Sequence, residues 1–365
     1  MRWPWQRQDT SDQWVVSWSG QTLAYVLAHR GAEGAWQILK SGVVQQGSDS
    51  TEDFVGRLQE LGLKGARVHA MLRPEQYQVL QVESPAVPPE ELRSAARYQV
   101  REMLQTHIDD VTLDVMRVGS IVGSGAPKGL GHLFVVVTAN AVVREINVLG
   151  QALGWTVPVI DIQETAQRNL QTALSARTGQ VERAQAALVL VDCQQAVLTI
   201  SAQEELYYTR RFELPAGFLA GALDLAGGGP ANEAQAFSPV QEYVPEYSVG
   251  GVSYGTDYSE ARALPTAASA GGEGDEAAQR FLLEVQRSVD VWDRSWSSLP
   301  LNGIYLYAGA RSPELSSWMA AQLGLRVEPL DVQALFPGFE AASGQVQALC
   351  LPLLGVLMRA ETRQP

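Results

Sequence analysis

Positive charge is scarce in this sequence compared with negative charge. It has 27 lysines and arginines against 40 aspartates and glutamates, which gives a formal net charge of −13. A general nucleic-acid binder needs many basic residues to neutralise phosphates, so this balance argues against that class of protein. An acidic surface suits a basic protein partner, and it favours solubility equally well.

Long apolar runs are absent. None approaches the roughly 20 residues that a helix needs to cross a bilayer. The most hydrophobic late stretch, residues 346–358, is too short and contains Pro352 and Gly355. The first residues, MRWPWQRQ, lack the apolar core of a signal peptide. We therefore expect neither a membrane span nor a signal peptide, and residues 1–13 are predicted to form a flexible N-terminus.

Cysteine and catalytic motifs are equally sparse. Cys193 and Cys350 form no disulfide framework, and neither they nor the four histidines show the spacing of zinc ligands. The chain contains no GxxxxGK(S/T) phosphate-binding loop and no GxSxG nucleophile turn. The sequence therefore predicts no metal ion and no catalytic residue.

What the sequence does contain is a distinctive unit at residues 77–118. YQVLQV alternates apolar and polar residues, which predicts a strand at 77–82. The prolines and glutamates of VPPEEL suit a helix start, and the apolar spacing after them predicts a helix over 90–105. A second strand is predicted at 111–118. The spacing of apolar residues in this unit is that of any strand–helix–strand unit with an amphipathic helix.

Shorter elements flank this unit on both sides. Before it, turn residues and alternation predict four strands, at 14–18, 23–28, 36–40 and 67–72. A helix is predicted between the third and fourth of them, at 51–62. After it, strands are predicted at 133–137 and 156–160 and helices at 140–154 and 164–177. A second three-strand opening follows at 187–191, 196–201 and 205–212, and the last elements are predicted at 276–296, 304–307, 313–323, 326–329 and 346–359.

The central unit resembles a known family. Its strand, followed by VPPEELRSAARYQVREML and IDDVTLDV, is similar to the PilM-like proteins of type IV pilus assembly. The likeness is strongest to the MshI branch, which serves the mannose-sensitive haemagglutinin (MSHA) pilus. Two further stretches support it: VPVIDIQETAQRNL at 157–170 resembles the family's segment between its two halves, and FLLEVQRSVDVWDR at 281–294 resembles its EIQRSLDYYE helix.

The resemblance implies an α/β fold. It is the duplicated actin-like (RNase H-like) fold of the FtsA, PilM and GspL superfamily, with a small inserted β-α-β subdomain. On this basis we divide the chain into a first core subdomain, an insertion, a second half and a mobile loop rich in Gly, Ala and Pro. The first core subdomain comprises residues 14–70 and 138–180, and the insertion comprises residues 71–137. The second half comprises residues 186–225 and 276–365, and the mobile loop comprises residues 226–275.

The resemblance also implies where a nucleotide would bind. Three loops would hold it, and all three depart from the family pattern. The first lacks the aspartate that orients magnesium, and the second has a large glutamine where a small residue would lie against the phosphates. The third retains only part of the glycine-rich pattern that would contact the nucleoside. The degenerate positions are Ser17, Ser19, Gly20, Asp192, Gln194 and Gly309. We therefore expect neither ATP with magnesium as a cofactor nor ATPase activity. The alternative is an ATP-binding protein, ATPase or sugar-kinase relative of the same fold.

The function that the resemblance implies is a non-catalytic scaffold on the cytoplasmic side of the inner membrane. It would bind the cytoplasmic tail of a PilN/MshJ-like inner-membrane protein and couple it to the assembly ATPase. A component like GspL of type II secretion is a further alternative. The tail would lie in a groove between strand 77–82, helix 90–105 and the core near 67–72. The candidate contact residues are Leu92, Arg93, Ala96, Arg97, Arg101 and Leu104.

Overall fold

The computed structural model describes residues 12–31, 34–118, 131–190, 195–214, 218 and 273–359. The predicted flexible N-terminus and mobile loop fall almost wholly outside these residues. Their inner boundaries differ slightly from the sequence prediction, since Asp12 already begins a strand and Glu273 already begins a helix.

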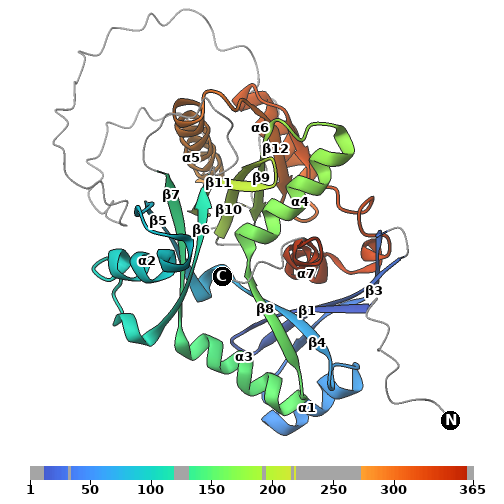
Figure 1. Ribbon diagram of the computed structural model, residues 1–365. Coiled ribbons are helices and arrows are strands. Elements are labelled where there is room, and N and C mark those ends of the chain that lie inside the picture. Colours follow the sequence, from blue (N-terminus) through green and yellow to red (C-terminus); the bar gives the residue numbers. More distant parts are fainter. Residues whose placement is uncertain are drawn as a thin grey trace, which may run out of the picture.

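Two five-stranded sheets have the same strand order and the same strand directions (Figure 1). In each, the first three strands are antiparallel neighbours and two later strands add in parallel. The first sheet has the order β3-β2-β1-β4-β8, with β1 (Asp12–Ser19), β2 (Thr22–Arg30), β3 (Trp36–Gln45), β4 (Arg67–Leu72) and β8 (Thr156–Ile162). The second has the order β11-β10-β9-β12-β13, with β9 (Ala184–Leu190), β10 (Gln195–Ala202), β11 (Glu205–Glu213), β12 (Leu301–Tyr307) and β13 (Val327–Pro329). This repetition confirms the duplicated architecture.

Helices cover the outer faces of both sheets. The first is covered by α1 (Thr51–Glu60) and α3 (Asn140–Leu153), and the second by α5 (Glu273–Ser295) and α6 (Ser312–Leu323). The ends of α1 and α3 follow from sequence: the Ser50 hydroxyl accepts the Asp53 N–H at 3.1 Å, and Gly154 takes a φ of +69° at the end of α3.

The inner faces are covered by two exchanged helices. α4 (Gln163–Thr178) follows the last strand of the first sheet but packs on the second sheet. α7 (Gly344–Leu357) follows the second sheet but packs on β1, β2 and β3. The two helices lie side by side between the sheets (Figure 1). Our assignment of residues 276–365 to the second half followed chain order, and α7 departs from it.

A third, three-stranded sheet sits beside the other two. Its order is β5-β7-β6, with β5 (Tyr77–Glu83), β6 (Val111–Val118) and β7 (His132–Ala139). Helix α2 (Leu92–Val100) covers one face and is shorter than the predicted 90–105. Its apolar stripe ends at Val100, and the chain turns at once, with the Met103 N–H bonded to the Val100 carbonyl at 2.9 Å. Four 3-10 turns complete the described elements: η1 (Pro74–Gln76), η2 (Pro89–Glu91), η3 (Ile108–Asp110) and η5 (Phe339–Ala341).

The other face of the small sheet contacts both halves of the molecule. Tyr77 packs with Leu72 and Ile162 of the first sheet. Val118 and Phe134 belong to the apolar cluster of the second half. The small sheet therefore fixes how the two large sheets sit relative to each other.

Candidate functional site

The first hairpin is the place where the resemblance puts the first phosphate loop. Gly20 turns it with a φ of +60°. Ser17 is buried, and its hydroxyl has no hydrogen-bond partner among the described residues. The Ser19 hydroxyl donates to the Glu75 carboxylate at 2.8 Å, and the Gln76 amide donates to the Trp18 carbonyl at 2.8 Å. The turn η1 is therefore tied directly onto this hairpin.

Of the other predicted nucleotide positions, the structure describes only Gly309. Asp192 and Gln194 lie outside the described residues. Gly309 follows β12 with a φ of +58°, and its carbonyl accepts the Ser312 hydroxyl at 2.7 Å. These contacts are those of an ordinary helix start.

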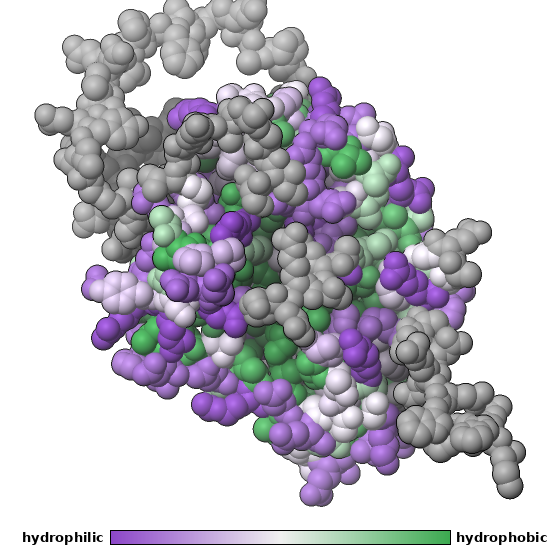
Figure 2. All heavy atoms as spheres, in the orientation of Figure 1, coloured by the Kyte–Doolittle hydropathy of each residue, from purple (hydrophilic) through white to green (hydrophobic). Residues whose placement is uncertain are grey.

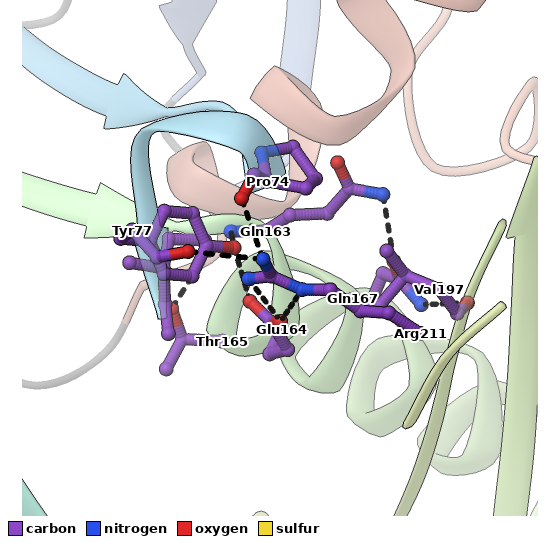
Figure 3. Close-up of polar contacts among 9 residues, drawn as sticks. Pro74, Tyr77, Gln163, Glu164, Thr165, Gln167, Val197 and Arg211 are labelled. Carbon is purple, nitrogen blue, oxygen red and sulfur yellow. Dashed lines mark hydrogen bonds and ion pairs between the residues drawn. The ribbon is translucent and has the colours of Figure 1, made fainter. Parts of the chain in front are cut away.

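A cluster of polar contacts lies between the two halves, at Glu164 of α4 (Figure 3). This carboxylate has no exposed side-chain surface. The Arg211 guanidinium, from β11, bonds the Glu164 Oε1 through Nη2 at 2.9 Å and through Nε at 3.2 Å. The Tyr77 hydroxyl donates to the other carboxylate oxygen. Both oxygens of this buried carboxylate are thereby satisfied.

Arg211 also reaches the inserted subdomain. Its Nη1 donates to the Pro74 carbonyl at 2.5 Å and to the Tyr77 carbonyl at 3.0 Å. Its guanidinium lies over the Tyr77 ring, 4.4 Å from the centroid. One side chain of the second sheet therefore binds a helix, a 3-10 turn and the first residue of β5.

The electrostatics of this site keep the Tyr77 hydroxyl protonated and the Arg211 guanidinium charged. Burial, with the neighbouring Glu164 charge, raises the pKa of Tyr77 well above 10.0, so its hydroxyl remains a donor. Burial alone would lower the pKa of Arg211, but Glu164 and Tyr77 outweigh it and raise that pKa. Removing one partner of a buried ion pair leaves the other uncompensated, which costs about 3–5 kcal/mol.

Polar side chains continue along α4 from this site. The Gln167 amide donates to the Val197 carbonyl at 3.2 Å, and the Gln171 amide donates to the Gln185 carbonyl at 2.7 Å. On the other side, the Asn169 amide donates to the Gly355 carbonyl of α7 at 2.9 Å. α4 is thus a polar connector whose amides bond backbone carbonyls of the second sheet and of α7.

The apolar residues of α2 that were expected to line a partner-binding groove lie instead against the small sheet's own core. Leu92 and Ala96 are buried in the core of the small sheet, and Leu104 is half-buried against it. Because α2 covers the face of that sheet opposite to the first sheet, it cannot wall a groove that faces residues 67–72. Leu92 and Ala96 are therefore not available as anchors.

The arginines of α2 are on the surface. Arg93 pairs with Asp114 at 2.9 Å, and Arg97 pairs with Asp109 at 3.0 Å. Arg101 is exposed. Their partners are exposed carboxylates of the same subdomain, and such surface pairs contribute about 0–1 kcal/mol.

An apolar seam does lie between the small sheet and the first sheet. Its partly buried members are Val79, Met116, Val136, Val142 and Val157. Ile160, on the same strand β8 as Val157, is 38% exposed. Figure 2 shows apolar side chains gathered low in the centre of this face, over the region that β8 and α3 occupy in Figure 1. Sequence reasoning missed this seam because its residues come from five separate elements.

The described residues hold neither a cluster of metal-ligating side chains nor a helix fit to span a membrane. No three histidines, cysteines, aspartates or glutamates of the described chain come together as a metal site would require. Within the same residues, no helix combines the length and apolar character needed to cross a membrane.

Comparison with known proteins identifies the fold. No family model and no curated protein sequence matches the chain. Among solved structures it is similar to a PilM-PilN type IV pilus biogenesis complex, with a TM-score of 0.60 and 14% identity over 95% of this chain and 98% of that one. With the duplicated sheets and exchanged helices, this likeness shows that the chain has the actin-like fold.

Two more distant likenesses were found. One is to the cytoplasmic domain of EpsL, an inner membrane component of the type II secretion system of Vibrio cholerae, at a TM-score of 0.39 and 16% identity over 62% of this chain and 79% of that one. The other is to a Bacteroides thetaiotaomicron protein with an actin-like ATPase fold and unknown function, at a TM-score of 0.42 and 9% identity over 94% and 97%.

Proposed function

We propose that this chain is a non-catalytic cytoplasmic scaffold of a type IV pilus machine of the MSHA kind. It holds the cytoplasmic tail of a PilN/MshJ-like inner-membrane protein and couples that protein to the assembly ATPase. The observation that carries the proposal is the likeness, over 95% of the chain, to a protein solved in a PilM-PilN complex. Motifs at 77–118, 157–170 and 281–294 support the same family independently.

The apolar seam is the surface that we assign to the tail. It lies between the small sheet and the first sheet, which is the general position of the predicted groove, and it is lined by aliphatic side chains. An extended peptide gains affinity from a few apolar anchors in such a seam and from backbone pairing at a strand edge. β8 is an edge strand of the first sheet, so it offers such an edge beside Ile160.

The scaffold role is supported by the state of the first hairpin. Ser17 stands where the resemblance expects an aspartate, and η1 is bonded to the hairpin turn. An actin-like ATP-binding protein with a degenerate site, or a component like GspL, is the alternative function. Binding of MgATP separates the first alternative from the scaffold.

The test is binding of a synthetic peptide with the sequence of a PilN/MshJ-like tail from the same genome. Ile160→Glu should weaken binding at least tenfold and leave the melting temperature nearly unchanged, because the side chain is 38% exposed. Val148→Glu is the matched control, since Val148 is 63% exposed and lies outside the seam. Equal binding by both variants would place the tail elsewhere, and absence of binding by the wild type would refute the scaffold proposal.

A further inference from the structure

The contacts of Arg211 join parts of the molecule that belong to different sheets. The residue belongs to β11 of the second sheet, and its partners are Glu164 of α4, Pro74 of η1 and Tyr77 of β5. Glu164 follows the last strand of the first sheet by two residues, and η1 and β5 lead into the small sheet. A single guanidinium therefore ties the second sheet to both other sheets.

The chain of contacts does not stop at η1. Glu75 accepts the Ser19 hydroxyl at 2.8 Å, and Gln76 donates to the Trp18 carbonyl at 2.8 Å. The carbonyl of Gln76 also accepts the Thr138 hydroxyl from β7 at 2.7 Å. A continuous series of hydrogen bonds thus runs from β11 through η1 to the first hairpin.

We propose that this series is a built-in latch that holds the two halves closed without a nucleotide. A ligand bound between two halves would favour their closed arrangement by joining one half to the other. Here the protein's own cation, Arg211, contacts the groups on both sides. The latch goes beyond the proposed function and does not depend on it.

Burial makes the latch persistent. Glu164 has no exposed side-chain surface, so its charge is stable there only while Arg211 and Tyr77 contact it. The planar fork of arginine meets a carboxylate and two carbonyls at once, which lysine cannot do. Opening the halves would separate Arg211 from the Pro74 carbonyl of η1 and the Tyr77 carbonyl of β5, and would take the Tyr77 hydroxyl away from the buried Glu164 carboxylate.

The test measures the distance between the halves. Spin labels are placed at Lys64→Cys in the first half and Gln322→Cys in the second half, both exposed positions, in a Cys193→Ser background. Cys350 can stay, because burial raises the pKa of its thiol to about 12 and it has no exposed surface. Pulsed electron paramagnetic resonance then gives the distance distribution with and without MgATP.

The latch predicts a single narrow distribution for the wild type that MgATP does not change. Arg211→Met should add a second, displaced population. Arg210→Met is the matched control: it removes the same charge one residue away, but the Arg210 partners Glu284 and Ser288 both lie in the second half. Its distribution should remain that of the wild type.

Two variants guard against a failure to fold. Arg211→Met with Glu164→Gln leaves no uncompensated charge, and Gln76→Leu with Ser19→Ala removes both side-chain bonds between η1 and the hairpin, at the far end of the series. Both should also broaden the distribution. A broad wild-type distribution that MgATP narrows would overturn the latch, and so would folded Arg211 variants that match Arg210→Met. Peptide binding, measured separately, reports on the scaffold proposal and not on the latch.

Discussion

Gly355 of α7 lies directly against Ala166 of α4 at the crossing of the two exchanged helices. A Cβ atom on Gly355 would overlap the Ala166 carbonyl oxygen, which is backbone and cannot move aside as a side chain can. The Asn169 amide, one turn along α4, donates to the Gly355 carbonyl at 2.9 Å. The closeness of the helices therefore depends on the missing side chain.

Gly355→Ala should destabilise the protein. The overlap forces the helices apart and strains the Asn169 bond, at a cost of about 1–3 kcal/mol or more. Urea unfolding measures the loss. Gly56→Ala in the interior of α1 is the control, because its new Cβ meets nothing within 4 Å and should add about 1 kcal/mol of stability. Equal midpoints for the two variants would contradict the tight crossing.

A glycine in the hairpin between β10 and β11 should stabilise the protein. Its two turn residues, Gln203 and Glu204, have φ values of 50° and 69°, which side chains disfavour. Glu204→Gly should stabilise the protein by about 1 kcal/mol, because it relieves a left-handed conformation. It leaves the Gln203–Glu182 hydrogen bond of 2.9 Å in place. Glu204→Ala, which keeps the strain, should give no such gain in thermal unfolding.

Acid should destabilise the first sheet through His69. Burial and, less strongly, the charge of Arg67 lower the pKa of His69 below 6.5. The unfolded chain then binds more protons than the native chain below pH 6.5, so the free energy of unfolding falls as pH decreases through that range.

His69→Gln should flatten this part of the pH profile of the urea midpoint between about pH 7 and 5, whereas His132→Gln, at an exposed position, should not. A slope that survives the first change would assign the acid sensitivity to other groups.

MgATP at micromolar concentration should leave the melting temperature unchanged. Our reason is the loss of the magnesium-orienting aspartate at Ser17 and the bulk of Gln194. Saturation at about 100 times the dissociation constant would add about 2.7 kcal/mol, which differential scanning fluorimetry detects easily. A clear upward shift that Asp192→Ala abolishes would favour the ATP-binding alternative.

Local elements could be predicted well from sequence. The strands at 67–72 and 111–118 have the predicted bounds, because their alternation stops at clear turn residues. The helix over 90–105 was predicted too long: residues 101–105 favour a helix in themselves, but the chain turns after Val100. Which sheet α7 would cover was also beyond reach, since it is buried all round from Cys350 onward and carries no distinct face that would indicate its partner.

The central ion pair could not be predicted either. Glu164 has the pattern of an ordinary acidic residue in the first turn of a helix, and Arg211 is one of two arginines in a strand. The two lie 47 residues apart in sequence, and only the packing of α4 on the second sheet brings them together. Partner residues on α2 were misjudged for a related reason: an apolar helical stripe has the same pattern whether it meets its own core or a ligand.

The helix exchange also sets the order in which this protein can fold. During synthesis the first sheet emerges complete by Ile162, yet one of its faces stays bare until α7 arrives near the end of the chain. Contacts between residues so far apart in sequence slow folding and prolong the exposure of hydrophobic surface. The apolar inner face of the first sheet therefore stays uncovered until α7 has been synthesised.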